Sequence, residues 1–167
     1  TRMALLSPSL SQIHFARRGL CAALLALAAL PAAAQFRVEI SGVGATQLPI
    51  AIVRFRDEDK SPQSPSAIIR ADLERSGAFR IVDTGTTSFD EGSRPEMSQW
   101  RTRAADALVA GSVTRLADGR YDVRFKLWDV VKGTPLGGQS TAVEAGDLRL
   151  AAHRIADYIY EKLTGEK

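Results

Sequence analysis

Cysteine and histidine are almost absent from this chain of 167 residues, which contains one cysteine and two histidines. The sequence also contains no Gly-x-Ser-x-Gly element, the turn that presents a nucleophilic serine in many hydrolases. A disulfide needs two cysteines, and a zinc site takes its ligands mainly from cysteine and histidine. These shortages argue against a disulfide-stabilised scaffold, a zinc module and the commonest hydrolase designs.

The first part of the chain has the features of a cleavable secretory signal peptide. Arg17 and Arg18 precede an apolar run at residues 19–30, and small residues follow at 32–34. A basic start, a short apolar run and an Ala-x-Ala site predict cleavage before Gln35. The run is short and alanine-rich for a membrane span. We therefore expect residues 1–34 to be a signal peptide, with an uncleaved anchor as the alternative.

Cleavage at that point would change both the charge and the cysteine content. It would remove three arginines and no acidic residue from a chain with 22 basic and 19 acidic residues, so the two signs would balance. Nucleic-acid binding relies on a basic excess that neutralises phosphates, and the mature chain would have none. Cys21 would also be removed, which would leave no residue for a disulfide, for thiolate zinc ligation or for thiol catalysis.

Residues 35–47 are predicted to form a flexible N-terminal arm. Apolar and charged residues alternate at its start, the period-two pattern of a strand with one apolar face: Phe36, Arg37, Val38, Glu39 and Ile40. Gly42 and Gly44 follow, and a chain end created by cleavage would lie on the other side, so the segment is poorly tethered. The alternative is an edge strand of the main sheet.

A strand, a helix and a second strand are predicted over residues 48–83. Residues 50–55 are mostly apolar on both faces, as in a parallel strand that is covered on both sides. Ser64 and Pro65 mark the start of the helix, and Gly77 marks its end. Residues 79–82 give the second strand. A helical connection between two strands of one sheet makes them parallel and the crossover right-handed.

The remainder predicts a short helix, three strands and a final helix. Ser98 is the expected cap of a short helix that carries Trp100 and Ala104 inward. Hairpin turns are expected at Asp118-Gly119 and at Lys132-Gly133. The last helix begins near 147 and ends at 165, and one apolar stripe runs along it: Leu148, Ala152, Ile155, Ile159 and Leu163. The predicted order is β-α-β-α-β-β-β-α.

The strand between the two turns is expected to be buried on one face and solvated on the other. Its apolar residues alternate without a break with three charged ones, and the charged set is Asp122, Arg124 and Lys126. The pair Gly137-Gly138 lies inside the next strand, and we interpret it as a bulge or a close approach of another group.

Few residues qualify as catalytic or metal-binding candidates. His153 and Asp157 are i, i+4 neighbours on the last helix, a spacing that fits an ordinary surface pair. Residues 57–59 are acidic, but they lack the alternating ligands and central glycine of a calcium loop, so a solvated turn is expected. We therefore predict a non-enzymatic protein with no cofactor and no metal site.

Five stretches, which run in one order through the chain, carry a family resemblance. They are PIAIVRF at 49–55, IIRADLERSGAFRIVD at 68–83, the series from Trp100 to Gly111, YDVRFKLWDV at 121–130, and HRIADYIYEKLTGEK from His153 onward. Together they resemble the TolB amino-terminal domain family, which belongs to the periplasmic Tol–Pal envelope system. The resemblance implies a mixed α/β (α+β) domain over residues 48–165. Its fold would be anticodon-binding-domain-like, with one mixed sheet of about five strands and two main helices.

The resemblance also implies a location and a partner. It places the protein in the periplasm of a Gram-negative bacterium, in a system that acts in outer-membrane constriction during cell division and in colicin import. In the family, the mature N-terminus binds the C-terminal domain of TolA. By position, this assigns TolA binding to the start of the arm: Phe36, Arg37, Val38, Glu39, Ile40, Ser41, Gly42 and Val43.

Part of the family pattern is not found in this sequence. A C-terminal β-propeller follows the domain in the family and binds the lipoprotein Pal and colicins, whereas this sequence ends at Lys167. We therefore expect Pal binding only where the propeller is present. The sequence leaves two interpretations open: a fragment of a longer protein or a stand-alone domain. Two rivals are another periplasmic envelope-assembly adaptor of the same fold and a periplasmic enzyme of unrecognised type.

Overall fold

The computed structural model describes residues 46–166 of the chain. The predicted signal peptide, residues 1–34, lies outside the described residues, and so does the predicted arm, residues 35–47, except for its last two positions. Within the described residues the chain forms five strands, three α-helices and two 3-10 turns. The strands and α-helices follow the order that the sequence predicts.

The five strands form one mixed sheet, as the sequence and its resemblance predict. Their order in the sheet is β2-β1-β3-β4-β5, in which β1 pairs in parallel with β2 and β3, and β4 pairs antiparallel with β3 and β5. The strands are β1 (Leu48–Ile52), β2 (Phe79–Val82), β3 (Ala107–Arg115), β4 (Tyr121–Asp129) and β5 (Thr134–Val143). The helices are α2 (Pro65–Arg75), α3 (Met97–Thr102) and α4 (Leu148–Thr164), and the 3-10 turns are η2 (Glu58–Lys60) and η3 (Ala145–Asp147).

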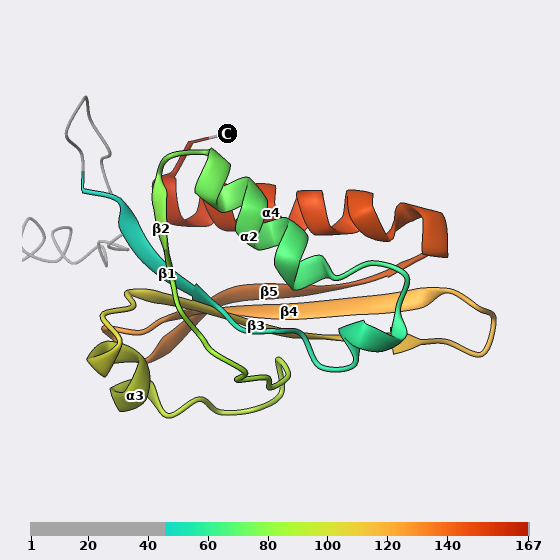
Figure 1. Cartoon of the computed structure of the whole chain (residues 1–167), viewed down its shortest axis with the longest axis horizontal. Coiled ribbons are helices and arrows are strands. Elements are labelled where there is room, and N and C mark those ends of the chain that lie inside the picture. The colour runs from blue at the N-terminus through green and yellow to red at the C-terminus, as the bar shows by residue number, and fades with distance from the viewer. Residues whose placement is uncertain (1–45, 167) are drawn as a thin grey trace, which may run out of the picture. The chain divides into compact units, whose positions relative to one another are not determined.

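Helices cover the sheet on both sides, but unequally. Figure 1 shows α2 and α4 on one side of the sheet and the short α3 on the other. The larger core lies under α2 and α4, where Ile50, Ile52 and Leu127 of the sheet meet Leu73 and Ile159 of the helices. The smaller core lies under α3 and joins its Trp100 to residues of β1, β3 and β4. The double cover predicted for β1 is therefore confirmed.

The ends of α2 lie where the sequence predicts, but the group that binds its first turn was not foreseen. Ser64 is the N-cap residue, Pro65 opens the helix and Gly77, at φ 77°, follows its end. The Ser64 side chain makes no capping hydrogen bond. Instead, the carboxylate of Glu58 accepts hydrogen bonds from the backbone N–H of Ser66 at 3.1 Å and from its hydroxyl at 2.7 Å.

Glu58 also corrects the prediction of a fully solvated turn at residues 57–59. Its relative exposure is 3%, whereas Asp59 beside it is exposed. The first N–H groups of a helix have no partner within the helix and favour a negative charge. The unpaired N–H groups at the start of α2 therefore explain why a glutamate is buried here.

The short helix α3 differs from its prediction at both ends. Its N-cap residue is Glu96, whose carboxylate accepts a 3.4 Å hydrogen bond from the backbone N–H of Ser98. The helix ends at Thr102, so Ala104 lies beyond it, exposed and in the left-handed region at φ 56°. Trp100 is buried, as predicted. The interpretation of Ser98 as the cap and of Ala104 as an inward residue is therefore wrong.

The antiparallel strands agree with the sequence except at one residue. The turn at Asp118-Gly119 joins β3 to β4, and the four alternating apolar residues of β4 belong to the core under α2 and α4: Tyr121, Val123, Phe125 and Leu127. Asp122, predicted to be solvated, is only 7% exposed, because it accepts hydrogen bonds from Ser140 at 2.8 Å and from Arg124 at 2.7 Å. Paired carboxylates can be buried where a free one cannot.

The glycine pair in β5 marks both a bulge and a close approach, as predicted. The register between β4 and β5 shifts next to Gly137. A Cβ atom added at Gly137 would lie 2.1 Å from the Oη atom of Tyr158 on α4. The last helix also follows its prediction: it ends before Gly165, which has φ 77°, and its predicted apolar stripe is buried.

Candidate functional site

The strand that follows the predicted arm, β1, lies inside the sheet between β2 and β3. Gln47 donates a 3.1 Å side-chain hydrogen bond to the carbonyl of Gly77, and the backbone N–H of Leu48 donates to Ala78 at 2.9 Å. Both bonds tie the start of β1 to the turn between α2 and β2. The eight predicted partner-binding residues, 36–43, lie outside the described residues, and their role stays a prediction.

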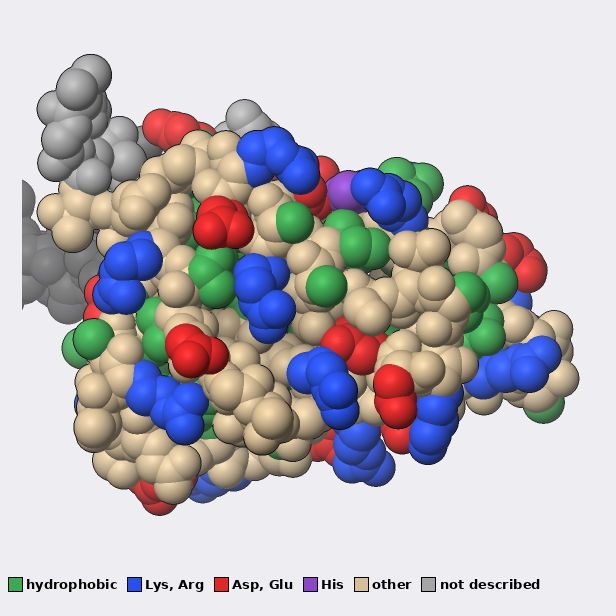
Figure 2. Space-filling model, in the orientation of Figure 1, with side chains coloured by type: hydrophobic (Ala, Val, Ile, Leu, Met, Phe, Trp, Pro, Cys, Tyr) green, Lys and Arg blue, Asp and Glu red, His purple; other side chains and the backbone are tan. Residues whose placement is uncertain are grey.

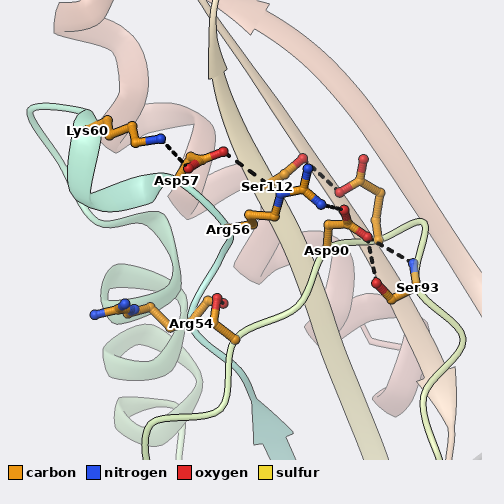
Figure 3. Close-up of polar contacts among 9 residues, drawn as sticks. Arg54, Arg56, Asp57, Lys60, Asp90, Ser93 and Ser112 are labelled. Carbon is orange, nitrogen blue, oxygen red and sulfur yellow. Dashed lines mark hydrogen bonds and ion pairs between the residues drawn. The ribbon is translucent and has the colours of Figure 1, made fainter.

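A polar network surrounds the chain just after β1 (Figure 3). Arg56 lies between two carboxylates: it forms an ion pair with Asp90, and its Nε atom is 3.9 Å from Asp57. Lys60 donates a 2.7 Å hydrogen bond to Asp57, and the Ser93 hydroxyl donates to Asp90 at 2.8 Å. The network thus joins the end of β1 to η2 and to the loop at residues 83–96.

The charges in this network compensate one another. The hydrogen bond from Lys60 is the main cause that lowers the pKa of Asp57 below its usual range. The Ser93 hydroxyl, followed by the charge of Arg56, lowers the pKa of Asp90. Both carboxylates are therefore ionised at neutral pH and are already held by donors, as expected for a network that fixes a loop.

A cavity of about 200 Å³ lies beside the network and is lined by Asp57, Lys60, Val113, Thr114, Arg115 and Tyr121. Over residues 46–166, no group of three or more histidine, cysteine, aspartate or glutamate side chains is placed to hold a metal ion. The Arg56–Asp90 ion pair, supported by the hydrogen bond from Ser93 to Asp90, holds the 83–96 loop against the chain after β1.

His153 has a different partner from the one that the sequence suggests. Its Nδ1 atom contacts the Oδ2 atom of Asp72 on α2, not Asp157 on its own helix. Asp72 also accepts a 3.1 Å hydrogen bond from Arg75. The histidine thus links α2 to α4. The i, i+4 rule considers one helix at a time, so it could not find a partner on a neighbouring helix.

The surface over α2 and the 83–96 loop carries charges of both signs. Figure 2 shows lysine and arginine side chains interspersed with aspartate and glutamate on this side, and its hydrophobic groups are small and separate. Large contiguous patches, apolar or of one charge, are the usual marks of an interaction face. This side of the domain has neither.

The two edges of the sheet offer main-chain hydrogen bonds instead. An edge strand leaves one row of N–H and C=O groups without a partner strand. The edge strand β2 has four residues, whereas β5 at the other edge has ten, none of them buried. Sequence reasoning assigned no function to β5, although one signal was present: residues 134–143 contain no charged side chain.

The described residues contain no helix that is long and apolar enough to cross a membrane. Comparison with known proteins gives a consistent set of relatives. The chain matches the profile of the TolB amino-terminal domain over residues 36–136. It is 64% identical over 151 residues to the Tol-Pal system protein TolB of Albidiferax ferrireducens, and 59% identical over 162 residues to that of a Polaromonas species.

These matches cover most of this chain but only part of each relative. They span 90% and 97% of this chain, and 36% and 37% of the two relatives. The crystal structure of TolB from Acinetobacter baumannii is similar in fold, with a TM-score of 0.62 and 30% identity over 78% of this chain and 32% of that one. The chain thus spans about a third of the length of the proteins it matches, and it belongs to the TolB amino-terminal domain family.

Proposed function

We propose that this chain serves the Tol–Pal system of the cell envelope as a periplasmic protein-binding module that catalyses no reaction. The observation that carries the proposal is the match to two relatives, both named Tol-Pal system protein TolB, at 64% and 59% identity. Roles in cell division and in colicin import would belong to the assembled system.

In this proposal the partner is the C-terminal domain of TolA, and residues 36–43 bind it. The mechanism is β-augmentation, in which an extended segment adds a strand to a partner's sheet. Main-chain hydrogen bonds supply affinity, and alternate side chains supply specificity. Here the alternate apolar set is Phe36, Val38 and Ile40.

The described domain would act as the scaffold that presents this segment. Gln47 and Leu48 are bonded to the turn between α2 and β2, so the residues before them start from a fixed point. A fixed starting point lowers the entropy that the segment loses when it binds. The proposal assigns the binding of Pal and of colicins to the family's propeller and not to any residue of this chain.

The test is a calorimetric titration of two chains, one beginning at Gln35 and one at Ala45, against the C-terminal domain of TolA. We expect binding by the longer chain and none by the shorter. Equal affinity of the two chains would rule out the arm as the binding segment. Binding by neither chain would rule out TolA as the partner.

Two matched triple variants of the longer chain test the mechanism. Alanine at Phe36, Val38 and Ile40 removes the apolar set, and we expect at least a tenfold loss of affinity, because each lost apolar contact contributes about 1 kcal/mol or more. Alanine at Arg37, Glu39 and Ser41 changes the alternate set and should have a smaller effect. A larger loss from the second variant would contradict strand addition with the apolar set toward the partner.

A further inference from the structure

The outer edge of β5 is a second place where a strand could be added. It pairs with β4 on one side and has no neighbour on the other side of the described sheet. Proteins usually protect such edges with charged side chains, prolines or bulges, because an unprotected edge accepts strands from other chains. The way in which β5 is protected therefore shows which part of it is open.

The protection of β5 is confined to its first half. Pro135 lacks an N–H group, and the register shift falls between positions 135 and 137. Tyr158 and Lys162 of α4 then lie against Gly137: an added Cβ atom would be 2.1 Å from the Tyr158 Oη atom and 3.6 Å from the Lys162 Cε atom. Residues 139–142 have no proline, no charge and no bulge, and all four are exposed.

The side chains that flank this open half differ between the two faces of the sheet. On the face toward α4, half-buried apolar groups pack against the core, namely Leu136, Val143 and Tyr158. Residues paired directly across two strands share a face. The opposite face therefore carries the small residues at positions 138, 140 and 142, which pair with Lys126, Arg124 and Asp122 of β4.

The opposite face carries two cations and one carboxylate. Asp122 is buried and is occupied by Arg124 and Ser140, whereas the Arg124 side chain is 54% exposed. Lys126 is partly exposed and stacks over Trp128, with its Nζ atom 5.1 Å from the ring centroid. The residues of β5 opposite these cations are small, so no bulky side chain of β5 separates them from a strand placed beyond the edge.

We propose that residues 139–143 of β5 bind an extended acidic segment of a partner protein as a sixth strand. In that segment, apolar side chains would face the α4 side and alternate with carboxylates that face Arg124 and Lys126. Main-chain hydrogen bonds to the edge of β5 supply affinity, and the charge pattern selects the partner. The proposal concerns residues 139–143 and not residues 36–43, so it stands or fails independently of TolA binding.

A pair of synthetic peptides provides the first test on the full chain. The acidic peptide alternates valine and glutamate between two threonines, and the control has lysine in place of each glutamate. We expect the acidic peptide to bind at least tenfold more tightly, with an affinity that falls as salt rises. It should also slow hydrogen exchange at the amides of residues 139–143. Binding without slower exchange there would overturn strand addition.

Adjacent prolines test the edge itself. Successive residues of an edge strand point their N–H groups alternately toward the neighbouring strand and toward solvent. Of Thr141→Pro and Ala142→Pro, neither of which removes a side-chain hydrogen bond to β4, one therefore removes a main-chain bond to β4 and lowers the melting temperature, while the other keeps it. The variant that keeps its melting temperature should lose acidic-peptide binding at least tenfold. Unchanged binding by that variant would refute the proposal.

Charge reversal tests the partner's chemistry. The variant Lys126→Glu should bind the acidic peptide several-fold more weakly and the lysine peptide more tightly than the original chain, because an attraction becomes a repulsion. Arg54→Glu carries the same change in net charge away from β5 and should bind both peptides as the original chain does. Equal effects of the two variants would show non-specific attraction and would contradict the proposal.

Two other occupants of the edge are distinguishable. If the chain itself forms a dimer that the edge-facing proline variant dissolves in analytical ultracentrifugation, the edge pairs with a second copy, and the proposal is wrong. If the acidic peptide binds only after residues 35–44 are deleted, the chain's own arm occupies the edge, and the proposal is again wrong. A monomeric chain that binds the acidic peptide with its arm present supports it.

Discussion

The parallel half of the sheet, β2, β1 and β3, is covered by side chains on both faces, whereas the antiparallel half, β4 and β5, is covered mainly on one. In β1 and just after it, Ala51, Ile52 and Val53 are all fully buried, although they point alternately to the two faces. In β5 none of the ten residues is buried. The two halves share one hydrogen-bonded sheet but differ in what lies above and below them.

The difference follows from how each strand is connected. A right-handed crossover places its connecting segment on a face that depends on the direction of the step along the sheet. The chain steps one way from β1 to β2 and the opposite way from β2 to β3, so α2 and α3 lie on opposite faces. The hairpins from β3 to β5 carry no helix. α4 covers most of β4 from the side of α2, while α3 meets only the end of β4 at Trp128.

The largest effect should come from opening a cavity in the doubly covered half. Phe55 is 1% exposed, and its ring packs closely against Gly111. A Cβ atom added at Gly111 would lie only 2.7 Å from the Phe55 Cε2 atom. Phe55→Ala would leave a cavity that Gly111, which has no side chain, cannot fill. We therefore expect the variant to lower the free energy of unfolding by about 3–5 kcal/mol in urea denaturation. Val131→Ala, at a side chain that is 63% exposed, is the control. A loss below about 1 kcal/mol for Phe55→Ala would contradict the comparison.

A smaller effect is expected from the buried carboxylate beneath α2. Glu58→Ala removes both hydrogen bonds to Ser66, and we expect it to lower the free energy of unfolding by about 1–3 kcal/mol. Asp59→Ala changes the exposed acidic residue next to it and should alter stability by less than about 0.5 kcal/mol. Equal effects of the two variants would mean that the general charge of the turn, not the contact with the helix start, stabilises α2.

We expect the Asp90 carboxylate to contribute about 1 kcal/mol or less to the free energy of unfolding, and this contribution should depend on pH. The Ser93 hydroxyl and then the Arg56 charge lower the pKa of Asp90 in the folded protein from 3.8. A group with a lowered folded pKa adds stability above its unfolded pKa and loses it as pH falls through the folded pKa. We therefore expect the original chain to exceed Asp90→Asn in stability at neutral pH. The difference in melting temperature should shrink below about pH 4, and a constant difference would contradict this assignment.

Local patterns predicted most of the fold, because each strand and helix carries its own signal. Gly77, the Asp118-Gly119 turn and Gly165 mark the ends of elements through backbone conformations that can be read from a few adjacent residues. The mixed sheet followed from the family resemblance. The arm could be predicted from sequence as a strand-forming segment, yet it lies outside the described residues, so its role awaits the TolA titration.

What the sequence did not reveal depends on contacts between distant segments. Glu58 is buried because the start of α2 lies next to it, and His153 meets Asp72 because two helices pack together. Asp122 is buried because β5 brings Ser140 to it. None of these partners lies on the same helix or strand as the residue that it binds. A pattern within one element therefore assigned each of these three residues to solvent or to the wrong neighbour.

The smallest effect should come from the open half of β5. Thr141 is exposed and pairs with Val123 of β4 through its main chain, so its side chain buries little surface on folding. We expect Thr141→Ala to change the free energy of unfolding by less than about 0.5 kcal/mol in urea denaturation. The same variant keeps the main-chain N–H and should keep acidic-peptide binding within a few-fold. A loss of stability near that of Phe55→Ala would mean that the two halves of the sheet do not differ in side-chain burial.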